Sequence, residues 1–171
     1  MRTNPAASLL PRRDLRCLLP GRRAVTGRCP RLPRRLAGPT ELKHFAVSAD
    51  CEDSSTNART DDFCRGLSSE LGQNCKVAKE TWLFGQLCVP GLRAIAAGEA
   101  ALAQLIIISA HHAEALTDGV KSWIDQWLGR TNNHGIVLLA LFDPVYQAVS
   151  SSMKVYLQDV ANRGDMEFLV K

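Results

Sequence analysis

The chain has 171 residues, which is enough for one domain and an additional segment, and its formal net charge is +4. The charge is divided unevenly, because residues 1–40 carry +9 from ten Arg and one Asp while residues 41–171 carry −5. The mildly acidic larger part gives no support for nucleic-acid binding by that part, and no run approaches the roughly 18–20 apolar residues of a membrane span.

Residues 1–40 also hold six of the eight prolines, and this composition predicts a disordered basic tail. Three interpretations of the tail stay open. It is an organelle-targeting peptide, a basic arm that touches nucleic acid or anionic membrane, or a leader from a mis-set start.

The six cysteines form no CxxC pair, and no apolar export segment is visible. Free thiols in a reducing compartment are therefore expected, which indicates a cytoplasmic protein. The targeting interpretation of the tail would place the protein in an organelle instead.

The folded part is expected to begin near Glu41, and the short apolar segment at residues 44–49 predicts the first strand. A polar cluster at residues 50–55 predicts a loop after it. A helix is expected over residues 57–71, because apolar side chains recur there at four-residue spacing and Gly72 follows as a stop.

Residues 75–79 alternate weakly and carry two lysines, which predicts a second strand at or near a sheet edge. An apolar connection that contains Trp82 leads to a helix opening at Pro90 and Gly91. The face of this helix is expected to consist of Leu92, Ile95, Ala96, Glu99 and Ala103.

Residues 104–110 contain four consecutive aliphatic side chains without alternation, as in a strand buried on both faces at the centre of a parallel sheet. The clearest helix of the chain follows, with Thr117 as its cap and Asp118 in its first turn. One apolar stripe at helical spacing predicts its buried face. The stripe consists of Val120, Trp123, Ile124, Trp127 and Leu128.

Residues 135–142 form a second unalternating run and predict another interior strand. A last helix with an apolar stripe from Met153 to Val160 precedes a final strand over residues 166–171. The alternation over residues 41–171 predicts a three-layer α/β domain with a doubly wound, parallel five-stranded sheet in the flavodoxin-like order 2-1-3-4-5.

In such a sheet, ligands bind beyond the carboxyl ends of the strands, where the strand order reverses. The segment after the first strand and the end of the central strand meet at this point, and the last two strands end beside it. The candidate ligand or metal residues are Asp50, Glu52, Asp53, Ser109, His111, His112, Asp143 and Lys171.

The closing segment, residues 164–171, has the form Gly-Asp-x-x-Phe-Leu-Val-Lys. With this segment, the five-unit alternation and the acidic loop, residues 42–171 resemble the receiver domains of two-component response regulators. The resemblance implies that Asp50, Glu52 or Asp53 helps to bind Mg²⁺. It also implies that Lys171 takes the place of the lysine that pairs with the phosphoryl group.

The chain departs from receivers at the residue that carries the chemistry. Ser109 stands where receivers have the phosphoacceptor aspartate, and a neutral hydroxyl cannot replace a carboxylate nucleophile or magnesium ligand. The hydroxyl residue usual after the fourth strand is absent, and so is the final helix. We therefore expect a non-phosphorylatable signalling or protein-interaction module, without assigned catalytic residues, whose partner is another protein or a small effector.

The segment Ser54 to Asn57 also resembles the hydroxyl-rich phosphate loop of flavodoxins, which implies FMN as a less favoured cofactor than Mg²⁺. The alternative function is then a flavin- or nucleotide-binding oxidoreductase, with Tyr146 as the aromatic residue after the fourth strand. A capped helix start is the other, favoured interpretation of this segment.

Two further chemistries use Cys51. With His111 or His112 and a neighbouring carboxylate it could form a zinc site, although adjacent histidines in extended chain point to opposite sides. Paired with His111 alone, it could act as a nucleophile. Histidines that merely end a strand are the favoured interpretation.

Overall fold

The computed structural model describes residues 43–111, 116–130, 135–144 and 152–171. The expectations for the tail at residues 1–40, for His112 and for Tyr146 lie outside these residues. Among the described residues, no helix combines the length and the apolar character needed to cross a membrane.

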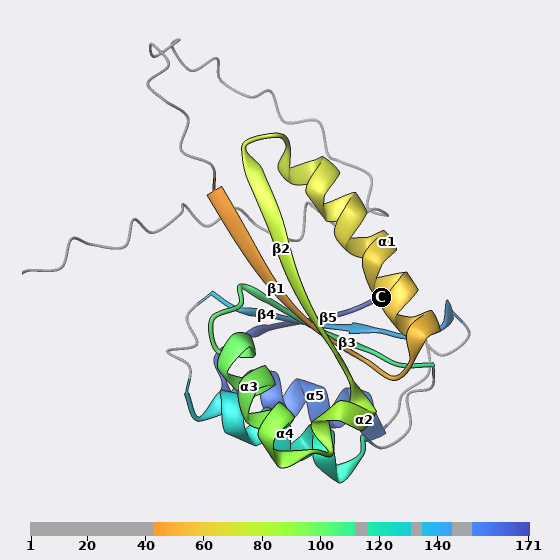
Figure 1. Ribbon diagram of the computed structural model, residues 1–171, viewed down its shortest axis with the longest axis vertical. Helices are drawn as coiled ribbons and strands as arrows, with labels where there is room; N and C mark the ends of the chain where they lie inside the picture. Colours follow the sequence, from red (N-terminus) through yellow and green to blue (C-terminus); the bar gives the residue numbers. More distant parts are fainter. Residues whose placement is uncertain (1–42, 112–115, 131–134, 145–151) are drawn as a thin grey trace, which may run out of the picture. The chain divides into compact units, whose positions relative to one another are not determined.

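Five parallel strands form one sheet in the order β2-β1-β3-β4-β5, which confirms the predicted topology (Figure 1). The strands are β1 (Lys43–Cys51), β2 (Cys75–Leu83), β3 (Leu105–Ser109), β4 (Val137–Leu141) and β5 (Glu167–Val170). The helices are α1 (Ser54–Leu71), α2 (Phe84–Leu87), α3 (Pro90–Ala100), α4 (Asp118–Leu128) and α5 (Ser152–Arg163).

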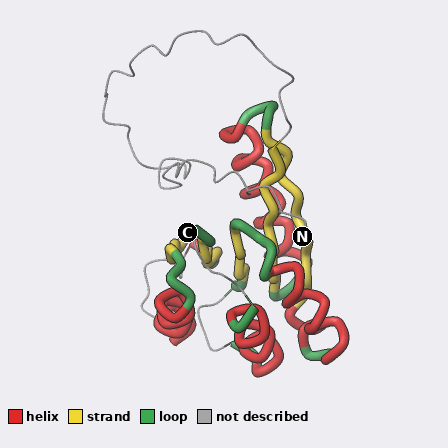
Figure 2. Tube along the Cα trace, turned by 90° about the vertical axis from the view of Figure 1, so that its left-hand side faces the viewer, coloured by secondary structure: helices red, strands yellow, loops and turns green. Residues whose placement is uncertain are grey.

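The helices are divided unequally between the two faces of the sheet. α1 lies along one face, and α2, α3, α4 and α5 lie on the other (Figures 1 and 2). The larger hydrophobic core lies between the sheet and these four helices, and it contains β3 and β4 side chains together with the buried stripe of α4.

The two unalternating runs are interior strands, as predicted, and every residue of β3 and of β4 is buried. The side chain of Thr117 accepts a hydrogen bond from the backbone N–H of Val120 and caps α4. Trp123 and Trp127 of that helix are fully buried, with ring centroids 5.8 Å apart, so both belong to the core.

The first strand and the first helix are longer than the sequence pattern predicted. β1 continues to Cys51, so Asp50 and Cys51 are strand residues and the prediction of a loop there is wrong. The cause is pairing on both sides, since Asp50 lies between Trp82 of β2 and Ile108 of β3. Only Glu52 and Asp53 separate β1 from α1.

The predicted face of α3 is wrong at one position, because the side chain of Ile95 is 54% exposed. The buried side chains of this helix are Ala96, Ala97 and Ala100, and Ala103 just beyond it is buried as well. Small side chains let α3 lie close to the sheet, and this packing outweighs burial of a single isoleucine.

Candidate functional site

Three loops meet at the carboxyl ends of the central strands and bring four of the predicted residues together. Glu52 and Asp53 follow β1, His111 follows β3, and Asp143 follows β4. The carboxylate Oε2 of Glu52 accepts a hydrogen bond from the backbone N–H of His111 at 2.9 Å, and the backbone N–H of Glu52 donates to the Ser109 carbonyl at 2.9 Å.

The imidazole of His111 lies between two carboxylates. Its Nδ1 is 3.2 Å from Oδ2 of Asp143, and its Nε2 is 3.0 Å from Oδ2 of Asp53. The hydroxyl of Ser55 is 2.9 Å from the same Nε2. His111 therefore ties together the loops after β1, β3 and β4.

Asp53 caps the first turn of α1. Its Oδ1 accepts hydrogen bonds from the backbone N–H groups of Ser55 and Thr56, both at 2.9 Å. The Thr56 side chain accepts in return from the Asp53 N–H, which completes a capping box. The bonds from Thr56, His111 and Ser55 hold the pKa of Asp53 well below its usual range.

This cap decides how the hydroxyl-rich segment is used. Ser54 to Asn57 form the first turn of α1, which is the capped helix start that the sequence favoured. The amides of Ser55 and Thr56 are already bonded to a carboxylate, so a phosphate would have to displace Asp53 to reach them. Nothing in this geometry favours the FMN interpretation.

Arg59 is the site residue that sequence reasoning missed. Its guanidinium donates to the carbonyls of Ala110 at 3.1 Å and Leu141 at 3.4 Å, and it forms an ion pair with Asp143. It therefore places a fixed positive charge between the ends of β3 and β4. The sequence carried no strong signal for it, because Arg59 lies beyond the first turn of α1, in which the helix dipole acts on a charge.

Three of the predicted site residues do not face this cluster. Ser109 is fully buried, and its hydroxyl donates to the backbone carbonyl of Thr56 in α1 at 3.0 Å. Asp50 is fully buried on the opposite face of β1, towards α3. The ammonium of Lys171 lies 5.4 Å from the centre of the Phe63 ring of α1, although its backbone ends β5 as expected.

Cys51 is not available as a nucleophile. Its side chain is fully buried against α1, with the sulfur 3.6 Å from the hydroxyl of Thr60. Burial is the main cause that raises the pKa of this thiol to about 11, so the unreactive protonated form dominates at neutral pH. The nucleophile pair of Cys51 with His111 is therefore not supported by the geometry.

The same contacts argue against a divalent cation at the strand ends. Within the described ranges, no group of three or more His, Cys, Asp or Glu side chains is placed to hold a metal ion. The carboxylate of Asp53 is engaged by α1, and that of Asp143 by Arg59 and His111. A Mg²⁺ ion prefers free carboxylate oxygens, so these residues do not fit it.

Ser55, His111 and Asp143 are connected in the order of a hydrolytic triad, yet two contacts oppose acyl transfer. The carboxylate of Asp53 lies at the Nε2 that would have to take the serine proton, and it favours a hydrogen on that nitrogen. The helix amides that could stabilise an oxyanion are bonded to Asp53. The cluster is suited to holding loops together and not to covalent catalysis.

We expect the Arg59→Met variant to have a free energy of unfolding lower by about 1 kcal/mol, because it removes the ion pair with Asp143 and the hydrogen bond to the Ala110 carbonyl. The partners are about 30% exposed, which keeps the effect modest. Urea denaturation measures it. Arg65→Met is the matched control, since its ion pair with Asp62 is largely exposed and should contribute nothing measurable.

No protein-family model matches this chain, and no curated protein matches it significantly.

Proposed function

We propose that the domain is a receiver-like signalling module that is not phosphorylated on an aspartate and that acts by binding another protein. The supporting observation is the environment of Ser109. The residue at the end of the central strand has no carboxylate, is fully buried, and uses its hydroxyl to hold the Thr56 carbonyl of α1. Neither a phosphoryl donor nor a magnesium ion would find a nucleophile or a ligand there.

The charges around Ser109 support the same proposal. In a module that is switched by phosphorylation, the negative charge of the added phosphoryl group changes the contacts of nearby charged side chains. Here Arg59 supplies a positive partner from within the chain, the His111 ring supplies a hydrogen-bond partner, and Asp143 contacts both. The described residues that follow β1, β3 and β4 thus contact one another without a ligand, which suits a constant binding surface.

Incubation with acetyl phosphate and Mg²⁺, followed by intact-mass measurement, tests this proposal. We expect no phosphorylated species, while a receiver domain with an aspartate at the equivalent place, treated in parallel, acquires one. A hydroxylamine-sensitive phosphate adduct on this protein would overturn the proposal.

The same preparation tests the nucleotide-binding alternative. We expect FMN, nucleotides and Mg²⁺ to leave the midpoint of thermal unfolding unchanged, because a ligand that binds only the native state must raise it. A rise with FMN would contradict the proposal and favour the oxidoreductase function.

A further inference from the structure

Among the described residues, the last strand has a partner strand on one side and none on the other. β5 stands at the end of the sheet order and pairs with β4. The N–H groups of Glu167 and Lys171 donate to the carbonyls of β4 and its flank, at 3.3 and 2.9 Å. Successive residues of a strand point their backbone groups to opposite sides, so those of Phe168 and Val170 point to the open edge.

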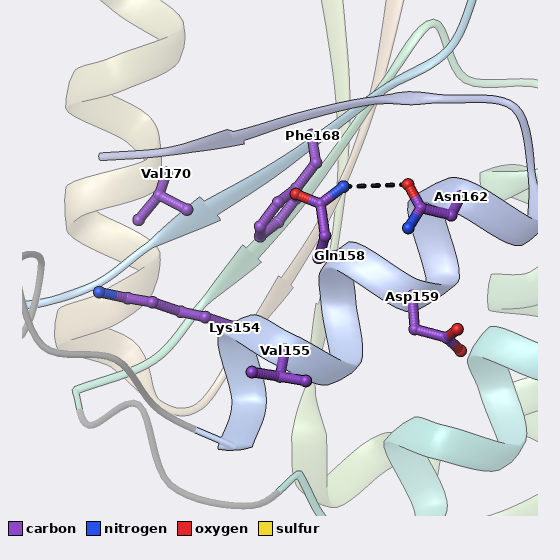
Figure 3. Close-up of a pocket in the computed structure, with 7 residues that line it drawn as sticks. All are labelled: Lys154, Val155, Gln158, Asp159, Asn162, Phe168 and Val170. Carbon is purple, nitrogen blue, oxygen red and sulfur yellow. Dashed lines mark hydrogen bonds between the residues drawn. The ribbon is translucent and has the colours of Figure 1, made fainter.

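Apolar side chains accompany this open edge. Between α5 and β5 lies a hollow of about 610 Å³, and Figure 3 shows Phe168 and Val170 on its strand side and Val155 on its helix side. Val155 is 66% and Val170 is 39% exposed. An exposed edge with apolar residues is a template for pairing with another strand.

The opposite edge of the sheet is protected against pairing with other chains by charged side chains. The edge strand β2 exposes Lys76 and Glu80, and Lys79 forms an ion pair with Asp61 of α1. Charged side chains along an edge discourage pairing with other chains. β5 differs from β2 in having one charge at each end, Glu167 and Lys171, with the apolar residues Phe168, Leu169 and Val170 between them.

The charged residues of β5 are complementary to those of a second copy of the strand that runs in the opposite direction. When two copies of the strand pair antiparallel around Leu169, Glu167 of each copy lies opposite Lys171 of the other, which forms two opposite-charge pairs. In the same register Phe168 lies opposite Val170. These two residues carry the outward backbone groups, so they can exchange both of their N–H···O bonds as hydrogen-bonded pairs do.

We propose that the protein forms a twofold-symmetric dimer in which two β5 strands pair antiparallel around Leu169 and join two sheets into one. The pairing covers Val170 and the hollow beside α5 in both copies. A twofold interface brings the same patch of both subunits together, as this self-complementary strand requires. The open edge of β5 contains none of the residues on which the proposed function depends, so dimerisation and phosphorylation can be tested separately.

Charge reversal tests the register. In sedimentation equilibrium of the full chain, we expect the wild type to be a dimer, and Glu167→Lys and Lys171→Glu each to weaken the dimer at least tenfold through like-charge contacts. An equimolar mixture of the two variants should form a heterodimer, because each Lys then meets a Glu. The double variant E167K/K171E should dimerise again, which also controls for the lost contact of Lys171 with Phe63.

Val170→Pro tests the backbone bonds, because proline removes an outward N–H and leaves the N–H groups that bond to β4 in place. We expect this variant to be monomeric, with a thermal transition that shows a folded domain. The concentration of about 200 µM is on the order of the dissociation constant of a weak dimer or above it. A wild type that stays monomeric at this concentration would overturn the proposal. A dimer that persists in V170P, or a variant mixture that does not associate, would also overturn it.

Discussion

The Trp123→Ala variant is expected to have a free energy of unfolding lower by about 3–5 kcal/mol. Trp123 is fully buried on the stripe of α4 and packs against Trp127, so its removal leaves a cavity between two layers. A domain of this kind has a net stability of roughly 5–15 kcal/mol, and the variant should therefore unfold at a much lower urea concentration.

Two controls separate the cavity from loss of hydrophobic area in general. Trp123→Phe keeps most of the ring volume and removes an indole N–H that has no hydrogen-bond partner among the described residues, so it should cost much less. Ile95→Ala removes an exposed side chain from a helix on the same face and should stay within about 0.5 kcal/mol of wild type. Equal losses for Trp123→Ala and Ile95→Ala would contradict the assigned packing.

Asp50→Asn should stabilise the protein at pH 8, by an amount on the order of 1–3 kcal/mol. Both carboxyl oxygens of Asp50 are buried, and no described residue hydrogen-bonds to them. Burial, and secondarily the negative charge of Glu99, raises the pKa of this carboxyl well above its usual range. Ionisation of Asp50 is therefore unfavourable in the folded state, and asparagine has the same shape without the charge.

The sign of the pH dependence follows from the raised pKa. Below about pH 4 the carboxyl is protonated in the folded and unfolded states, and wild type and Asp50→Asn should be equally stable. As the pH rises towards the folded-state pKa, the unfolded state loses the proton first and the wild type loses stability that the variant keeps. Urea denaturation from pH 4 to 9 measures the widening difference.

Asp62→Asn is the control for this profile, because its carboxylate is 71% exposed and its removal should leave the pH dependence unchanged. If the difference between wild type and Asp50→Asn stayed constant over the pH range, Asp50 could not be a carboxyl that is protonated in the fold. A partner that the described residues do not include would then have to stabilise its charge.

The architecture could be predicted because its signals are local. Runs of aliphatic residues without alternation at 105–108 and 136–139 indicate strands buried on both faces, and the stripe of α4 indicates a helix on a core. Five such elements in alternation leave few topologies for a parallel sheet, since crossovers are right-handed. The sheet order followed from these rules and is the observed one.

The site was predicted less well, because its geometry depends on how long each strand pairs and on which face a side chain points to. An acid at the end of an apolar run is normally solvated, so Asp50 was expected in a loop. Pairing with β2 and β3 instead extended the strand and turned its carboxyl into the core. Asp50 lies within β1 and points to the core on the side of α3, whereas Asp53 follows the strand and caps α1.

The chain's local patterns were thus sufficient for the number and order of the strands, most helix faces and the edge at which polar residues meet. Only the tertiary structure placed His111 between Asp53 and Asp143 and brought Arg59 of α1 to the ends of β3 and β4. The physical reason is distance in the sequence. Helix and strand signals repeat every two to four residues, whereas these contacts join residues 32 to 84 positions apart and carry no periodic signal.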